Sequence, residues 1–350
     1  MHSEIVPERA NEELPIDNLA EYLRDKLAGA EAGITVLQFT EGHSNLTYLV
    51  SCADGHECVL RRGPLGPVAP KAHDMAREYR VLQAVSRHFP EAPKPLHLCE
   101  DVSILGAVFF LMERRRGSIL RSEVPQIFQQ VADHARRISE AFVHCLVRLH
   151  AIGVTDRDLL GLGKPEGFLV RQVQGWSERW LLARTDAVPE MEAVSEWLRQ
   201  QIPQSPESAL VHNDYKLDNV MFSSVDTVEA VLDWEMATLG DPIADLGLTL
   251  CYWTWVNAPG VNLGTAPSIT AQPGWYTRDE FIARYAERTG RDVSRITYYE
   301  VLGIYKLAVI LQQIYVRYRR GQTQDARFAN FDERVKALAR VAATLAEKQG

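Results

Sequence analysis

The spacing of hydrophobic residues predicts a region of strands near the start of the chain. After a polar leader, apolar residues at helical spacing over 16–27 predict a short amphipathic helix. The period then becomes two, which is typical of strands, and the Asp-Gly pair in "ADGH" predicts a hairpin turn. The expected strands are 34–39, 46–50, 57–61, 95–100 and 107–112, with a helix over 71–88. This pattern favours an antiparallel sheet with one embedded helix, an α+β region.

From about Gln126 the hydrophobic pattern becomes helical. The clearest stretch is "ISEAFVHCLVRLHAI", in which apolar side chains between Ile138 and Leu149 line one face. Short strands interrupt this region on both sides of residues 212–219 and again at 230–233. Further helices are expected over 171–184, 190–201, 297–320 and 332–348, and from about Thr277. Residues 258–274 are rich in Gly, Pro, Ser and Thr, and loops of this length tend to be binding loops.

Composition narrows the class of protein. Of the 350 residues, 46% are hydrophobic and 24% charged, as in a soluble globular protein. The net charge of −8 and the dispersed Lys and Arg residues argue against a nucleic-acid partner. Five cysteines without a C-x-x-C pair argue against a disulfide framework and against a zinc site. Neither a signal peptide nor an apolar run of membrane-spanning length is visible, so we expect a cytoplasmic protein without a membrane partner.

One strongly polar stretch, "LVHNDYKLDNVMF" at 210–222, lies between two apolar flanks. Asp214 and Asn219 lie in it, and Asp233 ends the later apolar run "AVLD". Two carboxylates and an amide carbonyl beside short strands can converge on Mg²⁺, which takes oxygen ligands and is usually bound together with substrate phosphates. The alternative for these polar groups is that they cap turns and helices.

The same residues carry a resemblance to a known family. "HNDYKLDN" followed by "VLDWE" resembles the catalytic loop and metal-binding aspartate of the aminoglycoside phosphotransferase family, small-molecule relatives of the protein kinases. "ATLGDPIADLG" at 237–247 is similar to its branch that includes the kinase-like domains of acyl-CoA dehydrogenase family members. The resemblance covers residues 33–320. It implies a bilobal protein-kinase-like α+β fold, with a nucleotide-binding lobe over 1–112 and a larger, mainly helical lobe over 113–350.

The resemblance also implies roles for the polar stretch. Asp214 is expected to be the catalytic carboxylate that orients the attacking hydroxyl and accepts its proton, while Asn219 and Asp233 hold Mg²⁺ against the phosphates of ATP. His212, Asp241 and Asp245 are expected to fix the loop rather than to act in the chemistry. Lys216 and Asp218 are expected to point mainly to solvent, with the substrate as the alternative direction.

For nucleotide binding, the resemblance assigns Gly42, Ser44, Asn45, Arg61, Glu78, Met112, Glu113 and Arg114. Arg61 is expected to pair with Glu78, and strand alternation favours it over Arg62. Most kinases have lysine at that position, so arginine is a departure that keeps the charge but changes the geometry. A second departure is Asn213, where the family most often has glycine. Asparagine tolerates a left-handed backbone, so we expect the turn to survive.

The acceptor is expected to be a hydroxyl group of a small molecule. Seven residues separate Asp233 from Asp241 and no A-P-E motif follows, which argues against a protein acceptor. Residues 253–275 contain no Asp or Glu, which argues against a polycationic aminoglycoside. The branch resemblance suggests a hydroxyacyl-CoA instead. The alternatives are an aminoglycoside or other small-alcohol kinase, and a non-catalytic nucleotide-binding module. Candidate pocket residues, with core packing as the alternative, are Trp176, Arg179, Trp180, Tyr305, Lys306 and Gln312.

Overall fold

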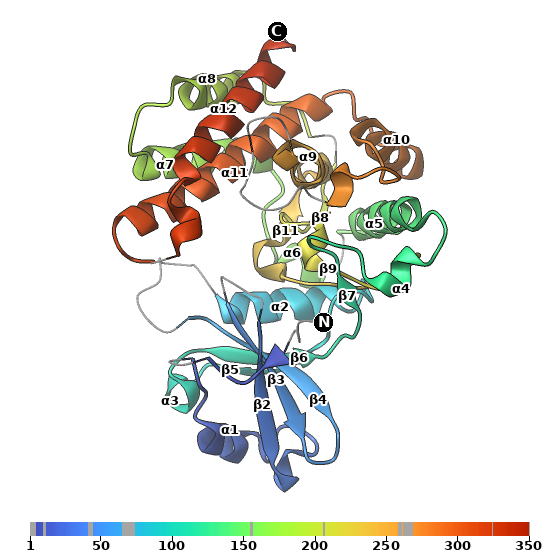
Figure 1. The fold of residues 1–350 in the computed structure, drawn as a ribbon, viewed down its shortest axis with the longest axis vertical. Coiled ribbons are helices and arrows are strands. Elements are labelled where there is room, and N and C mark those ends of the chain that lie inside the picture. The colour runs from blue at the N-terminus through green and yellow to red at the C-terminus, as the bar shows by residue number, and fades with distance from the viewer. Residues whose placement is uncertain are drawn as a thin grey trace. The chain divides into compact units, whose positions relative to one another are not determined.

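The chain forms two compact units in the computed structural model (Figure 1). The described residues are 5–9, 12–40, 45–64, 74–154, 157–205, 207–257, 261, 269–323 and 325–349. The N-terminal unit comprises Met1–Arg116 and Glu229–Glu235, and the C-terminal unit comprises Gly117–Val228 and Met236–Gly350. The N-terminal unit thus reaches beyond Met112, because Arg114 and Arg116 both form ion pairs with Glu57.

The N-terminal unit is built on a six-stranded antiparallel sheet with the strand order β1-β2-β3-β4-β6-β5. The strands are β1 (Ile5–Val6), β2 (Ile34–Phe39), β3 (Leu46–Cys52), β4 (Glu57–Arg62), β5 (Pro95–Cys99) and β6 (Phe109–Glu113). Helices α1 (Ile16–Leu23) and α3 (Val102–Leu105) contact each other, and α2 (Met75–Val85) packs against β5 and β6. Alternate residues of β4 face opposite sides, so Leu60 joins the core with Tyr48 and Phe109 while Arg61 points the other way.

The C-terminal unit is mainly helical. Its helices are α4 (Gln126–Gln129), α5 (His134–His150), α6 (Arg157–Leu160), α7 (Phe168–Ala183), α8 (Pro189–Gln200), α9 (Pro242–Trp253), α10 (Arg278–Thr289), α11 (Ile296–Arg319) and α12 (Phe331–Glu347). Its short strands pair as β7 (Ser118–Ile119) with β9 (Val220–Ser224) and as β8 (Ala209–Val211) with β11 (Thr238–Gly240). Strand β10 (Thr227–Val231) follows β9. Helix α11 is buried along most of its length and packs against α7, α8, α9 and α12 (Figure 1).

Two glycines set the close approach of α9 and α11. A Cβ atom added to Gly247 would lie 2.5 Å from the backbone carbon of Tyr299, and one added to Gly303 would lie 3.1 Å from the Gly247 carbonyl oxygen. Both distances are shorter than ordinary van der Waals contact, so the helices can cross this closely only because these residues lack side chains. The crossing places α11 beside the helix that follows β11.

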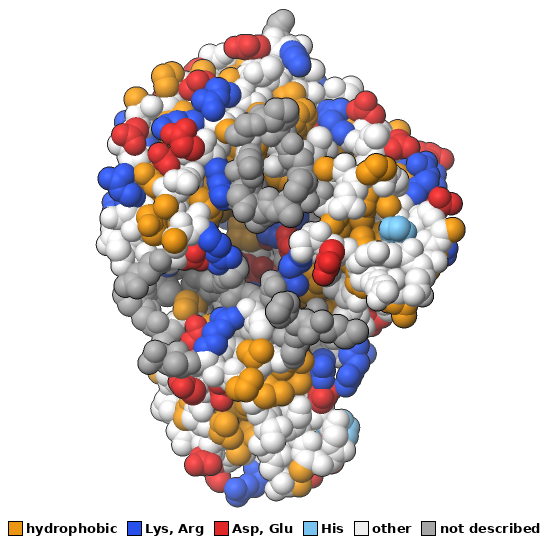
Figure 2. Space-filling view, viewed as in Figure 1, with side chains coloured by type: hydrophobic (Ala, Val, Ile, Leu, Met, Phe, Trp, Pro, Cys, Tyr) orange, Lys and Arg blue, Asp and Glu red, His pale blue; other side chains and the backbone are white. Residues whose placement is uncertain are grey.

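The α+β class predicted from the sequence is confirmed. The predicted helix over 71–88 begins at Met75, because the Asp74 side chain accepts a hydrogen bond from the Arg77 backbone N–H and caps it. The first helix ends at Leu23 rather than reaching Leu27. No helix in the described part of the chain is both long enough and apolar enough to span a membrane. On the face seen in Figure 2, acidic and basic side chains are interspersed, in keeping with the dispersed charge of the sequence.

Candidate active site

The turn after β8 is held by one buried aspartate. Asp245, in α9, accepts hydrogen bonds from the backbone N–H groups of His212 at 2.6 Å and Asn213 at 2.8 Å. It also contacts Nε2 of His150 at 3.2 Å. Burial would raise the pKa of Asp245, but the hydrogen bond and charge of His150, together with His212, outweigh it and hold the pKa below its usual range. Asp245 therefore fixes the loop, as the sequence suggested.

Asn213 adopts the left-handed conformation expected of it. Its φ is 63°, and its side-chain Nδ2 donates to the Met236 carbonyl at 3.1 Å. Asparagine therefore takes the position at which the resembled family most often has glycine. The hydrogen bond of its side chain offsets part of the steric cost of the left-handed backbone. Asp241 is likewise structural, because it caps α9 through the Ile243 N–H and accepts from the Tyr299 hydroxyl at 2.8 Å.

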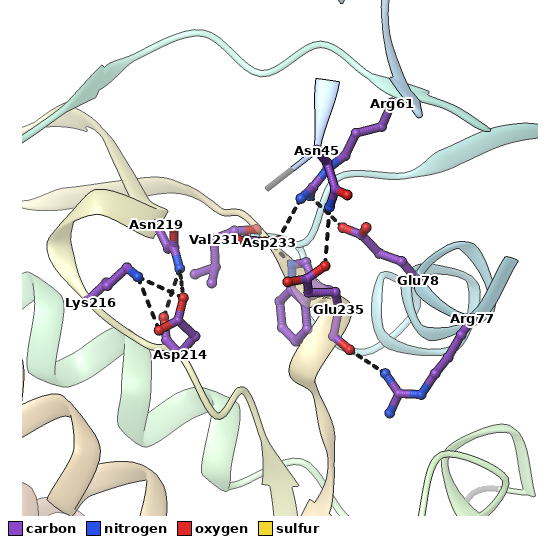
Figure 3. Close-up of polar contacts among 11 residues, drawn as sticks. Asn45, Arg61, Arg77, Glu78, Asp214, Lys216, Asn219, Val231, Asp233 and Glu235 are labelled. Atoms are coloured by element: carbon purple, nitrogen blue, oxygen red, sulfur yellow. Dashed lines mark hydrogen bonds and ion pairs between the residues drawn. The ribbon is translucent and has the colours of Figure 1, made fainter. Parts of the chain in front are cut away.

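The Asp214 carboxylate is oriented by two neighbours on its own loop (Figure 3). Asn219 Nδ2 donates to its Oδ2 at 2.8 Å and to its backbone carbonyl at 2.9 Å, and Lys216 Nζ lies 2.9 Å from Oδ2. The expectation that Lys216 points to solvent is wrong: its ammonium lies 4.9 Å from the centre of the Tyr252 ring. Burial opposes the charge of Lys216, but Tyr252 and Asp214 raise its pKa above the ordinary value.

In the N-terminal unit, Arg61 lies between two carboxylates (Figure 3). Its Nη1 donates to Glu78 Oε1 at 2.6 Å and its Nη2 donates to Asp233 Oδ1 at 2.7 Å. Burial opposes the charge of Arg61, yet the two carboxylates raise its pKa. Burial also raises the pKa of Glu78, to about 7, although Arg61 pulls it down. Asp233 has a φ of 67°, a strained backbone of the kind that gathers at functional sites.

Arg62, the alternative to Arg61, faces the opposite side of the sheet. Its guanidinium donates to the Leu105 carbonyl at 3.1 Å, the Glu12 carbonyl at 3.0 Å and the Tyr48 hydroxyl at 3.1 Å. Arg62 therefore belongs to the core of the sheet, and strand alternation correctly separated the two arginines.

Glu235 was not predicted from the sequence, although it directly follows the "VLDW" segment. Its Oε2 accepts a hydrogen bond from Asn45 Nδ2 at 3.2 Å, and its backbone carbonyl accepts one from Arg77 (Figure 3). Glu235 thus links Asn45, which directly precedes β3, to the start of α2. Of the three predicted loop residues, Asn45 is described, and Gly42 and Ser44 lie outside the described residues.

The three predicted hinge residues lie at the end of β6. Met112 is flanked by Val59 of β4 and Pro95 of β5. The Glu113 N–H donates to the Lys94 carbonyl at 2.8 Å, so that N–H is already satisfied within the sheet. Arg114 forms an ion pair with Glu57.

The predicted pocket residues are mostly core residues. Trp176 and Trp180 are buried, and Gln312 donates to the Ala183 carbonyl at 3.0 Å. Tyr305 is also buried, and Lys306 donates to the Asn213 carbonyl at 2.8 Å. Arg179 is exposed and lies 4.6 Å from the centre of the Trp176 ring. Most of the predicted binding loop over 258–274 lies outside the described residues.

The donor groups of the predicted metal ligands suit Mg²⁺. Because the Asn219 amide nitrogen is occupied by Asp214, its carbonyl oxygen is the atom left for a cation. The described residues contain no cluster of three or more His, Cys, Asp or Glu side chains that could hold a metal. A site with few protein ligands, completed by phosphate oxygens, is the kind that Mg²⁺ uses.

Comparison with known proteins places this chain among phosphotransferases. The family model described as "Phosphotransferase enzyme family" matches residues 35–296. Mouse acyl-CoA dehydrogenase family member 10 is 33% identical over 98% of this chain and 32% of its own length, and human acyl-CoA dehydrogenase family member 11 is 32% identical over 95% of this chain and 43% of its own length. The chain thus spans a third to two fifths of these relatives.

Solved structures of this fold include a candidate aminoglycoside phosphotransferase from Ralstonia eutropha, with a TM-score of 0.80, 29% identity and coverage of 96% of this chain and 99% of that one. Aminoglycoside phosphotransferase APH(4)-Ia, in a ternary complex with AMP-PNP and hygromycin B, shares the fold at a TM-score of 0.60 and 17% identity, over 94% of this chain and 98% of that one. The fold is thus that of the kinase-like phosphotransferases. With most of its length matched by the family model, the chain belongs to the phosphotransferase enzyme family.

Proposed function

We propose that this protein transfers the γ-phosphoryl group of ATP, together with Mg²⁺, to a hydroxyl group of a small molecule. The observation that carries the proposal is the orientation of Asp214, whose carboxylate is held by Lys216 and Asn219. The loop itself is held by α9, because Asp245 accepts a hydrogen bond from the Asn213 N–H. Phosphoryl transfer depends mainly on positioning and on charge neutralisation, so a rigidly held carboxylate is what the acceptor hydroxyl requires.

In this proposal each residue has a separate task. Asp214 accepts a hydrogen bond from the acceptor hydroxyl, aligns its oxygen and takes its proton as that oxygen bonds to the γ-phosphorus, while the bond from this phosphorus to the bridging oxygen breaks and ADP leaves. Asn219 and Asp233 would hold the cation, which supplies neutralisation of the phosphate charge when bound. Lys216 keeps the carboxylate of Asp214 in one orientation.

Nucleotide binding is proposed for the N-terminal unit. Arg61 is kept charged by Glu78 and Asp233, which accept hydrogen bonds from its Nη1 and Nη2, and its positive charge is proposed to attract the phosphates. Asn45, together with Gly42 and Ser44, is proposed to border the phosphates, and Met112, Glu113 and Arg114 to border the adenine. The nucleotide analogue in the ternary complex of APH(4)-Ia supports ATP as the donor.

For the acceptor we propose a hydroxylated acyl-CoA. The support is the similarity to acyl-CoA dehydrogenase family members over nearly the whole chain, together with the lack of acidic residues over 253–275. Hygromycin B in the complex of APH(4)-Ia makes an aminoglycoside the natural competing acceptor. The third possibility is a nucleotide-binding module without turnover. It is suggested by the two departures from the family pattern, Arg61 in place of lysine and Asn213 in place of glycine.

A mass-spectrometric acceptor screen with ATP and Mg²⁺ tests the proposal, because it identifies the phosphorylated product directly. Asp214→Asn should lower kcat by at least about 100-fold with little change in ATP affinity, since it removes the proton acceptor and keeps the shape. The matched control is Asp218→Asn, an exposed carboxylate on the same loop, which should keep kcat within about twofold. Asp233→Asn should instead weaken Mg·ATP binding.

The outcomes distinguish the three hypotheses: a hydroxyacyl-CoA kinase, an aminoglycoside kinase and a nucleotide-binding module without turnover. Phosphorylated aminoglycosides without phosphorylated hydroxyacyl thioesters would overturn the acceptor assignment and keep the kinase. Mg·ATP binding without product over the whole panel would favour the binding module. Full activity in Asp214→Asn would remove the proposed base.

A further inference from the structure

Lys306 is a buried lysine whose partner is a backbone carbonyl. It lies in α11, is 7% exposed, and its Nζ donates to the Asn213 carbonyl oxygen at 2.8 Å. Lysine is rarely buried to this extent unless it is paired, because removing an ammonium from water is costly. A residue maintained at that cost is expected to have a specific use.

The contact acts on the peptide group that leads into Asp214. The Asn213 carbonyl and the Asp214 N–H belong to one planar unit, so fixing the carbonyl oxygen fixes the plane from which the Asp214 backbone starts. The Asn213 N–H is already bound by Asp245 and its side chain by Met236. With Lys306 on the carbonyl, the left-handed residue next to Asp214 is held at its amide, its side chain and its carbonyl.

Charged groups around Lys306 are few and of both signs. Burial is the largest influence and lowers the pKa of Lys306 to about 8, helped by Lys216 and Arg179. Asp214 and Asp245 oppose that shift. The Trp176 ring also lies nearby, with its centre 5.5 Å from Nζ, and the thiol of Cys251 is close enough to be influenced by the charge of Lys306. Lys306 therefore changes charge in a pH range where an enzyme can be assayed.

We propose that Lys306 is a positioning residue for the phosphoryl transfer, holding the peptide plane that aims the Asp214 carboxylate at the acceptor hydroxyl. This inference rests on the proposed function and deepens it. Two helices thereby hold the catalytic loop. Asp245 of α9 accepts hydrogen bonds from two backbone N–H groups of the loop, and Lys306 of α11 donates a hydrogen bond to one of its backbone carbonyls.

The test compares Lys306→Met with Lys306→Arg. Lys306→Met keeps the length of the side chain and removes the donor, so kcat should fall at least about 10-fold while the KM for ATP changes less than about twofold. Lys306→Arg keeps a charged donor and should recover part of the loss. In the natural protein kcat should fall as the pH rises through about 8, whereas Lys306→Arg should lack that fall because arginine stays charged.

Gln312→Met is the matched control, since Gln312 is a buried polar residue of the same helix that donates to the Ala183 carbonyl, away from the loop. It should leave kcat within about twofold. An unchanged kcat in Lys306→Met, or an equal loss in Gln312→Met, would overturn the proposal.

Amide hydrogen exchange separates this inference from the proposed function. A peptide covering residues 210–215 should exchange faster in Lys306→Met and remain as in the natural protein in Gln312→Met. This readout requires no acceptor, so it stands even if the natural protein shows no turnover. Unchanged exchange in Lys306→Met would mean that Lys306 does not hold the loop.

Discussion

Asn213 shows how a single residue can replace glycine in a demanding turn. A φ of 63° destabilises a residue that has a Cβ atom by about 1 kcal/mol, and the hydrogen bond from Nδ2 to the Met236 carbonyl offsets part of this destabilisation. Because the neighbouring Asp214 depends on the same turn, the backbone conformation here bears on function as well as on stability.

Two substitutions separate these contributions. Asn213→Ala should lower the free energy of unfolding by about 1–2 kcal/mol, because it keeps the Cβ atom in a left-handed backbone and loses the side-chain hydrogen bond. Asn213→Gly should be within about 0.5 kcal/mol of the natural protein, since the loss of the bond is offset by relief of the strain. Urea denaturation measures both, and an equal cost for the two variants would contradict this account.

Local pattern at the residue scale predicted some contacts and missed others for a physical reason. Alternation along β4 was enough to choose Arg61 over Arg62, because the two faces of a strand differ regularly. The partners of Lys306 and Glu235 could not be predicted in this way. Asn213 lies far from Lys306 in sequence, and the Glu235 contact is made with Asn45, which directly precedes β3. Only tertiary packing brings such pairs together.

At the element scale, the crossing of α9 and α11 is the feature on which the catalytic loop depends. Asp245 lies just before Gly247 in α9, and Lys306 lies one turn after Gly303 in α11. The close contact at the two glycines therefore sets the distance from each of these side chains to the backbone of the catalytic loop. The hydrophobic period of the sequence predicts that the helices exist. It does not predict this close contact, because a glycine within a helical pattern does not reveal what packs against it.

Gly247→Ala and Gly175→Ala should have opposite effects on stability. At Gly247 the new Cβ would lie 2.5 Å from the Tyr299 backbone, so the helices must separate at a cost of about 3 kcal/mol or more. At Gly175 in α7 the nearest atom is Arg179 Nη1 at 3.3 Å, the end of a flexible side chain, so the gain in helix propensity should stabilise by about 0.5 kcal/mol. Thermal unfolding compares the two, and a stable Gly247→Ala variant would contradict the packing argument.

At the scale of the whole molecule, buried charge links stability to pH. Arg61 and Glu78 are buried as a pair in the N-terminal unit, whereas Lys306 in the C-terminal unit is buried against a carbonyl. In the buried pair the opposite charges offset part of the cost of leaving water, whereas Lys306 has no carboxylate bound to its ammonium and keeps its proton at the expense of folding. The stability of the folded chain should therefore respond to the proton on Lys306.

The sign of that response follows from the two pKa values of Lys306, about 8 in the folded state and 10.5 for an ordinary lysine. Between these values the unfolded chain binds more protons, so the free energy of unfolding should rise with pH. Relative to Lys306→Met, the natural protein should gain up to about 3 kcal/mol from pH 8 to pH 10.5, while other titrating groups cancel in the comparison. Urea denaturation of both proteins across this range measures the difference.

A difference that stays constant across that pH range would mean that Lys306 does not titrate within it. The opposite trends predicted for the natural protein, kcat falling and stability rising above pH 8, would show that the charged lysine is kept for the loop and not for the fold. Because loss of the proton relieves the buried charge and at the same time weakens the donor to Asn213, the fall in kcat should be centred near pH 8, the pH at which the rise in stability begins. A fall in kcat centred well away from the pH at which the stability begins to rise would assign that fall to another group.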